Sequence, residues 1–158
     1  MSVDFEALLH SLSGRKVAFL LVGGAAAIVH GSARLTQDLD VVYDRAPDNL
    51  ERLVHALAEF KHYLRGAPPG LPFRWEAETL RRGLNFTLET TVGAIDLLGE
   101  IPGGGAYAGL LPESVEVELF GATCRCLSLR QLIRTKRAAG RPKDLEALAE
   151  LDALEEET

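Results

Sequence analysis

The chain has 158 residues, a length that suits one domain with a hydrophobic core of its own. Hydrophobic residues make up 47% of it and charged residues 25%, which excludes a disordered chain, a collagen-like chain and a coiled-coil rod. The 17 Lys and Arg against 23 Asp and Glu leave a formal net charge of −6, which argues against a protein that coats DNA through general basicity. We therefore expect a single globular domain over residues 1–158.

The cysteines and the apolar segments indicate where such a protein resides. Cys124 and Cys126 are too few and too closely spaced for a disulfide scaffold or a structural zinc site, so we expect reduced thiols on one face of a strand. The N-terminus carries acids ahead of its apolar residues, unlike a signal peptide. The longest apolar stretch, residues 17–29, is too short to span a bilayer. These features predict a cytoplasmic protein.

Apolar spacing predicts five regular elements in the first half of the chain. They are a helix over residues 5–12 followed by Gly14, a buried strand over 17–22, a short helix over 25–30 ended by Gly31, a strand over 38–43, and a helix over 50–57 begun by a capping box of Asp48 and Glu51. The proline- and glycine-rich residues 66–72 predict a loop.

The second half of the chain predicts two hairpins and two helices. The hairpins join strands over 84–88 and 92–98, and over 115–120 and 122–127 with a turn at Gly121; the helices run from Ser128 to about 139, ended by Gly140, and from Pro142 onward with Leu145, Leu148, Leu151 and Leu154 on the apolar side. The glycine-rich residues 102–112 predict a mobile loop over a site, and residues 155–158 a frayed tail.

The most informative segment is residues 21–44, LVGGAAAIVHGSARLTQDLDVVYD. Gly23 and Gly24 follow a buried strand and allow backbone N–H groups to approach an anion at the start of a helix. Asp38 and Asp40 alternate along the next strand, so both carboxylates project from one face. Such a pair repels itself unless a cation lies between, and oxygen-only ligands suit Mg²⁺ or Mn²⁺. Either motif alone is common on solvated loops and strand edges, but the two in this order predict phosphoryl or nucleotidyl transfer.

This segment resembles the signature of the polymerase-β-type nucleotidyltransferase superfamily. A fuller pattern is similar to the AbiEii-like branch, which includes abortive-infection proteins and type IV toxin–antitoxin toxins. Its residues are Gly23-Gly24, Ala26, His30-Gly31, Arg34, Thr36, Asp38-Leu39-Asp40 and the late Arg141-Pro142-Lys143-Asp144. The resemblance spans residues from about 17 to 154. It implies an α+β (α/β) nucleotidyltransferase fold: a single domain in which helices flank a mixed, mainly antiparallel sheet.

Enzymes of this kind need a third carboxylate on an adjacent strand, and Asp96 is our candidate. It interrupts an apolar strand, where a lone carboxylate is costly unless it is paired or bound to a cation. A hydrogen-bonded residue at a strand end is the alternative for Asp96, and Glu89 is its rival. The resemblance thus implies catalytic and metal-binding roles for Asp38, Asp40 and Asp96.

A cluster of basic residues near the end of the chain makes this region locally positive, although the net charge of the chain is negative. Its members are Arg134, Lys136, Arg137, Arg141 and Lys143. We predict that Arg137, Arg141 or Lys143 reaches the triphosphate of a nucleotide, with Lys143 the first choice and a solvated basic face the alternative. Asp144 could instead orient one of these cations. Thr36 is a further nucleotide-binding candidate, because its hydroxyl could hydrogen-bond near the carboxylates, or it simply ends the loop.

The leading hypothesis is a Mg²⁺-dependent (or Mn²⁺-dependent) nucleotidyltransferase. It would move a nucleoside monophosphate from an NTP, with ATP among the candidates, to a hydroxyl acceptor. The resemblance implies a tRNA end or a protein side chain as acceptor and a role as a toxin or defence component. The implied partners are a cognate antitoxin or a second copy of the chain, with no membrane and no general DNA binding.

The alternative hypothesis is a non-catalytic, nucleotide-binding or antitoxin-like regulatory partner on the same fold. Two departures from the family pattern favour it. Many members have Gly-Ser where this chain has Gly23-Gly24, and no separate acceptor-binding domain is expected beyond the core fold. The presence of all three carboxylates favours the enzyme, because like charges kept together without a cation are unfavourable.

Overall fold

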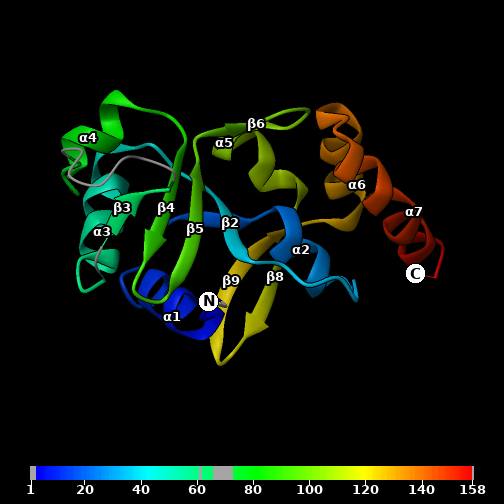
Figure 1. Cartoon of the computed structure of the whole chain (residues 1–158), viewed down its shortest axis with the longest axis horizontal. Coiled ribbons are helices and arrows are strands. Elements are labelled where there is room, and N and C mark those ends of the chain that lie inside the picture. Colours follow the sequence, from blue (N-terminus) through cyan, green and yellow to red (C-terminus); the bar gives the residue numbers. More distant parts are fainter. Residues whose placement is uncertain (1–2, 61, 66–72, 158) are drawn as a thin grey trace.

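Seven strands form one mixed sheet in the computed structural model, which describes residues 3–60, 62–65 and 73–157 (Figure 1). The strand order is β3-β4-β5-β2-β1-β9-β8. The strands are β1 (Phe19–Leu21), β2 (Asp38–Tyr43), β3 (His62–Leu64), β4 (Phe86–Thr90), β5 (Gly93–Leu98), β8 (Ser114–Leu119) and β9 (Ala122–Leu127). Strand β1 runs parallel to β9 and β2 runs parallel to β5, whereas the other four pairs are antiparallel. The mixed, mainly antiparallel sheet is therefore confirmed.

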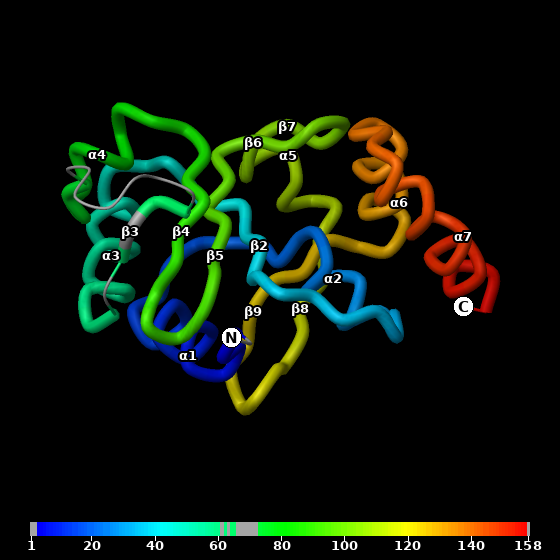
Figure 2. The backbone as a smooth tube through the Cα atoms, in the orientation of Figure 1, coloured from blue at the N-terminus to red at the C-terminus, as the bar shows by residue number. Residues whose placement is uncertain are grey.

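The helices form two groups beside this sheet. In the first group, α3 contacts both α1 and α4. In the second group, α6 contacts both α2 and α7. The bounds are α1 (Phe5–Gly14), α2 (Gly23–Val29), α3 (Pro47–Leu57), α4 (Ala77–Arg82), α5 (Tyr107–Leu110), α6 (Leu129–Ala139) and α7 (Pro142–Glu156). Figures 1 and 2 place α3 and α4 at the opposite end of the molecule from α6 and α7. No helix in the described ranges is both long and apolar enough to cross a membrane.

The elements with strong local signals agree with the sequence. Strand β2 has the predicted bounds, and both predicted hairpins form, as β4–β5 and β8–β9. Helix α6 begins at Ser128, whose Oγ accepts a hydrogen bond from the Gln131 N–H at 3.2 Å, and ends at Gly140 with φ +63°. Both cysteines are free and buried on β9, and burial raises the pKa of the Cys126 thiol to about 12.

Two helix starts differ from the prediction. Helix α2 begins at Gly23, earlier than expected. Helix α3 begins after Ala46 with Pro47 in its first turn and has no capping box, because Asp48 instead pairs with Arg52 at 3.0 Å. Proline at the first helical position loses no hydrogen bond, which allows the helix to start there.

The glycine-rich segment and the last helix also differ. Residues 102–112 do not form the predicted mobile loop: β7 (Gly105–Ala106) pairs with β6 (Glu100–Ile101), and α5 and a 3₁₀ turn (Leu111–Glu113) follow. Helix α7 buries Asp144, Ala147 and Leu151 and leaves Leu145 55% exposed. It continues through Glu156, so residues 155 and 156 lie within the helix, and fraying of residues 155–158 stays a prediction. The predicted loop 66–72 lies outside the described residues.

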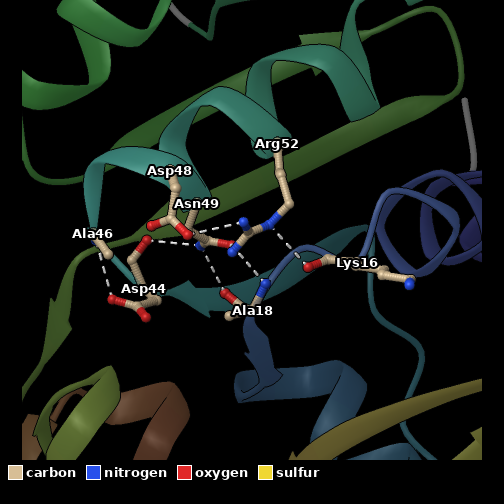
Figure 3. A network of polar contacts seen from close by, with 7 residues as sticks. All are labelled: Lys16, Ala18, Asp44, Ala46, Asp48, Asn49 and Arg52. Atoms are coloured by element: carbon tan, nitrogen blue, oxygen red, sulfur yellow. Dashed lines mark hydrogen bonds and ion pairs between the residues drawn. The ribbon is translucent and has the colours of Figure 1, made fainter.

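A buried asparagine joins α3 to the two central strands (Figure 3). The Asn49 side chain is fully buried. Its Oδ1 accepts from the Ala18 N–H at 2.7 Å, and its Nδ2 donates to the carbonyl oxygens of Ala18 and Asp44 at 3.1 and 2.7 Å. These groups lie just before β1 and just after β2, so Asn49 holds together the ends of the strands that carry the site described below.

Replacing Asn49 by Ala is expected to lower the free energy of unfolding by about 2–4 kcal/mol, because buried backbone groups lose their partners. Urea unfolding followed by circular dichroism measures the change. The matched control is Glu51→Ala on the exposed side of the same helix, which should change stability by less than about 0.5 kcal/mol. A loss below about 1 kcal/mol for Asn49→Ala would contradict this role.

Candidate active site

Three carboxylates from two neighbouring strands converge at one place. Asp38 and Asp40 lie on β2, and Asp96 lies on β5, where the parallel register sets it directly beside Asp40. One carboxylate oxygen from each of the three lies within 4.8 Å of the others. Each of these residues is partly buried. The structure therefore brings together the three acids that the sequence singled out.

The crowding of three carboxylates makes this triad a candidate cation site. The Oδ1 atom of Asp40 is buried and has no hydrogen-bond partner among the described residues. Burial and the neighbouring charges of Asp38 and Asp96 raise the pKa of Asp40 from 3.8 to about 8. Burial and Asp38 also raise the pKa of Asp96, which Arg65 partly offsets. An orphaned carboxylate oxygen and a donor set made only of oxygens fit a hard divalent cation such as Mg²⁺ or Mn²⁺.

The two glycines are needed because helix α2 starts against these side chains. Gly23 has φ +59°, and a Cβ atom there would lie 2.2 Å from Asp40 Oδ2. A Cβ atom on Gly24 would lie 2.7 Å from Thr36 Oγ1. The Thr36 hydroxyl donates to the Asp38 carbonyl oxygen at 3.1 Å. The backbone at the start of α2 thus packs directly on the acidic site, which only residues without a side chain permit.

A cavity of about 660 Å³ opens at this place. One wall contains Gly23, Gly24, Thr36 and the triad. A second wall comes from α6 and α7, and a third from β4, β5 and β6. The third wall was not predicted; its lining residues are Asn85, Thr87, Leu98, Glu100, Ile101 and Pro102. A cavity of this size falls in the range that holds a nucleotide-sized ligand.

The wall formed by α6 and α7 is basic. Lys136, Arg141 and Lys143 line the cavity. Asp144, whose side chain is only 1% exposed, pairs with Lys136 Nζ at 3.4 Å and with Arg141 Nε at 2.6 Å. Asp144 therefore holds two cations, where the sequence suggested that it orients one. Arg137 does not line the cavity, and it pairs with Asp152 on α7 at 3.1 Å.

Lys136 is the member of the basic cluster that sequence reasoning undervalued. Its side chain is 15% exposed, and its charge offsets a small part of the rise in the pKa of Asp40 that burial and the neighbouring acids cause. The helical spacing from Ser128 to Gly140 places it on a different face from Arg137, but only the packing of α6 shows which face meets the cavity.

The loop after α2 is fixed to the last helix. The Ser32 hydroxyl donates to Glu150 Oε1 at 2.6 Å, and the Ala33 N–H donates to Glu150 Oε2 at 3.1 Å. Arg34 donates to the carbonyl oxygen of Glu146 at 3.1 Å. Helix α7 therefore supplies two lining cations and also holds the loop that carries Thr36.

Sequence reasoning missed Arg65, which follows β3 and lies on the triad. Its guanidinium contacts Asp96 Oδ1 at 2.8 Å, Asp38 Oδ2 at 3.6 Å and Glu89 Oε1 at 3.3 Å. Glu89, the rival for the third carboxylate, is thus a partner of Arg65 and is not part of the triad. No local motif marks Arg65, because its position depends on the pairing of β3 with β4.

Comparisons with known proteins identify the fold of this chain. No protein-family model and no curated protein matches the chain. Among solved structures, it is similar to the lincosamide antibiotic adenylyltransferase LnuA in its lincomycin-bound form, with 15% identity and a TM-score of 0.63 over 98% of this chain and 99% of that one. A provisionally assigned nucleotidyltransferase from Thermotoga maritima is similar at 17% identity and a TM-score of 0.57, over 90% and 86% of the two chains. The chain therefore has the nucleotidyltransferase fold.

Proposed function

We propose that this protein is a metal-dependent nucleotidyltransferase that moves a nucleoside monophosphate from an NTP to an acceptor hydroxyl. The observation that carries the proposal is the convergence of Asp38, Asp40 and Asp96 beside a cavity whose facing wall is basic. The nucleotidyltransferase fold supports it. Carboxylates that bind a divalent cation next to donors for phosphate are the arrangement that phosphoryl-group transfer requires.

The three acids share one part in the proposed reaction, and Asp96 has a second. Asp38, Asp40 and Asp96 would hold Mg²⁺ or Mn²⁺ through their free oxygens. The bound cation would neutralise charge on the transferred phosphate. Asp96 is paired in register with Thr87, which lines the third wall of the cavity (the β4–β6 wall). An acceptor hydroxyl bound against this wall would therefore give its proton to Asp96. Attack of that hydroxyl oxygen on the α-phosphorus breaks the bond to the β-phosphate oxygen and releases pyrophosphate.

The triphosphate would lie between the start of α2 and the basic wall. Gly23, Gly24 and Thr36 line the cavity on one side, where backbone N–H groups at the start of α2 would donate to the phosphates. Lys136, Arg141 and Lys143 face it from the other, where they would balance the charge that leaves with pyrophosphate. Arg137 lies outside the cavity lining, so the proposal gives it no phosphate contact.

The β4–β6 wall favours a small acceptor molecule. Among its described lining residues Asn85, Thr87, Leu98, Glu100, Ile101 and Pro102, none is a Lys or Arg. Nucleic acids are held mainly through phosphate contacts from basic side chains, and Glu100 would repel a phosphate backbone. A small hydroxyl-bearing compound fits this wall better than the tRNA end suggested by the family resemblance, and the structurally similar LnuA is a lincosamide antibiotic adenylyltransferase solved with lincomycin bound. A toxin role with a cognate antitoxin, or a second copy of the chain as partner, rests on that resemblance alone.

The test is transfer from labelled NTPs. The protein is incubated with each of the four α-labelled NTPs and Mg²⁺, and with three acceptor pools: total tRNA, a cell protein extract and a set of small polyhydroxyl compounds. We expect label transfer and pyrophosphate release with at least one pair. EDTA should abolish both, and Mg²⁺ or Mn²⁺ should restore them.

Pyrophosphate release, measured beside calorimetric NTP binding, distinguishes the non-catalytic alternative. An enzyme and a regulatory nucleotide-binding module would both bind an NTP in a metal-dependent way, but only the enzyme would release pyrophosphate. Binding without transfer to any pool would favour the nucleotide-binding module, and absence of any metal-dependent NTP binding would contradict the enzyme and favour an antitoxin-like partner that needs no nucleotide.

A further inference from the structure

Arg65 is held on the acidic site by backbone carbonyl groups of β4. Its N–H donates to the Thr87 carbonyl oxygen at 2.9 Å, and its guanidinium donates to the Leu88 carbonyl oxygen at 3.1 Å. The side chain is 32% exposed and lies along β4 toward β5. The Arg65 guanidinium, which follows the edge strand β3, is therefore a positive charge held beside the carboxylates.

Arg65 is the counter-ion of two of the three triad acids. It donates a hydrogen bond to Asp96 Oδ1 at 2.8 Å and pairs with Asp38 Oδ2 at 3.6 Å. Within the described ranges, no other Lys or Arg makes an ion pair with Asp38, Asp40 or Asp96. The third acid, Asp40, has no ion pair and keeps an unpartnered oxygen.

We infer that Arg65 is a built-in competitor of the divalent cation, occupying Asp96 and Asp38 when metal is absent. The inference rests on the proposed function, since it concerns the same metal site. A carboxylate oxygen that accepts a short hydrogen bond from a guanidinium offers less negative charge to a cation, and a fixed positive charge repels an approaching one. The free oxygen of Asp40 is the ligand that needs no displacement.

The structure also provides a place for the displaced guanidinium. Glu89 lies 3.3 Å from Arg65 Nε, and the Leu88 carbonyl oxygen accepts from its NH₂ group. Both partners lie outside the triad, so Arg65 can release Asp96 and Asp38 without losing every contact. Metal and Arg65 are therefore alternative cations for the same two carboxylates, and their binding is antagonistic.

Arg65→Gln tests this antagonism in the full chain without an activity assay. Mn²⁺ affinity is measured by calorimetry and electron paramagnetic resonance, and thermal unfolding is followed in EDTA and in excess Mg²⁺. We expect the variant to bind Mn²⁺ about tenfold more tightly than the wild type. It should unfold at a lower temperature in EDTA, and Mg²⁺ should raise its unfolding temperature more than that of the wild type.

The matched control is Arg52→Gln. Arg52 on α3 donates to the Lys16 carbonyl oxygen, to Asp48 and to Asn49 Oδ1 (Figure 3), and it is not among the residues that line the cavity. This variant should have wild-type Mn²⁺ affinity and a wild-type shift with Mg²⁺. Arg65→Lys keeps the positive charge but lacks the planar guanidinium that donates several hydrogen bonds at once, so its Mn²⁺ affinity should lie between those of the wild type and Arg65→Gln. If the Gln variant does not fold, the comparison of Arg65→Lys with the wild type tests the same inference.

The outcomes separate this inference from the proposed function. If wild type and Arg65→Gln both fail to bind Mn²⁺, the metal site and with it the proposed function are wrong. If the wild type binds Mn²⁺ and transfers nucleotide but Arg65→Gln binds Mn²⁺ equally or more weakly, the competition is overturned and the proposed function stands.

Discussion

Asp40→Asn is expected to reduce nucleotidyl transfer by about a thousandfold or more, because the cation loses one of its charged ligands. The residual rate is measured with the labelled NTP and acceptor pair identified for the wild type. Asp48→Asn is the matched control, since Asp48 is an exposed acid on α3 remote from the cavity, and it should keep wild-type activity. Transfer by Asp40→Asn within tenfold of the wild type would contradict the proposed role of the triad.

The same variant should stabilise the metal-free protein at alkaline pH. The pKa of Asp40 is raised from 3.8 to about 8, so the folded state binds this proton more tightly than the unfolded state. The free energy of unfolding of the wild type therefore falls as the pH rises between these two values. Asparagine does not titrate, so in EDTA at pH near the upper value the variant should be more stable by about 1–3 kcal/mol, with a smaller gain at mildly acidic pH.

Urea unfolding in EDTA at two pH values measures this difference. Loss of transfer together with a gain in stability identifies a residue retained for metal binding at the expense of stability. A variant that is less stable than the wild type at the higher pH would instead show that Asp40 makes stabilising contacts as a carboxylate.

Gly23→Ala is expected to reduce transfer by about a hundredfold, because reacting groups displaced by an ångström lose this much. The added Cβ would lie 2.2 Å from Asp40 Oδ2 and 3.0 Å from its Cγ, so the carboxylate has to move. The positive φ of +59° adds a backbone cost of about 1–2 kcal/mol for a residue with a side chain. Mn²⁺ affinity should fall together with the rate.

Gly121→Ala separates these two effects. Gly121 has φ +79°, and a Cβ atom there would have no neighbour within 4 Å. It lies in the β8–β9 turn, outside the cavity lining. This control should lose a similar backbone contribution to stability but keep wild-type transfer and Mn²⁺ affinity. Equal losses of transfer in the two variants would mean that conformational strain, and not the contact with Asp40, causes the effect.

Local sequence patterns were sufficient to predict an element where a single capping residue or turn residue determines the backbone conformation. The predicted helix from Ser128 to Gly140 agrees with α6 because the hydroxyl cap and the left-handed glycine act on their own ends of the helix. The predicted turn at Gly121 agrees with the β8–β9 hairpin for the same kind of reason. These signals involve residues a few positions apart, so no knowledge of the rest of the fold was needed.

Packing overruled the local pattern in two places. The glycine-rich residues 102–112 read as an irregular loop, but β7 within them pairs with β6 just before them, and a Cβ atom on Gly104 would lie 2.5 Å from Leu110 Cδ2 and 3.3 Å from Thr135 Cγ2. In α7 the leucine spacing placed Leu145 inside, whereas the helix turns Asp144 and Ala147 inward because Asp144 has Lys136 and Arg141 as partners. A buried carboxylate with two cations is satisfied, and no spacing rule shows that in advance.

By itself, the sequence determined the acidic pair and the glycine turn, because the period of a strand puts Asp38 and Asp40 on one face and two glycines mark a close backbone approach. It indicated Asp96 as a carboxylate that must be paired or bound to a cation, and the family resemblance implied that Asp96 is the third acid of the site. The tertiary structure alone decided that β2 and β5 pair with Asp40 beside Asp96, that Lys136 faces the cavity, and that Arg65 lies on the triad. The physical reason is that these contacts join strands and helices far apart in the chain, and their register depends on burying the whole sheet.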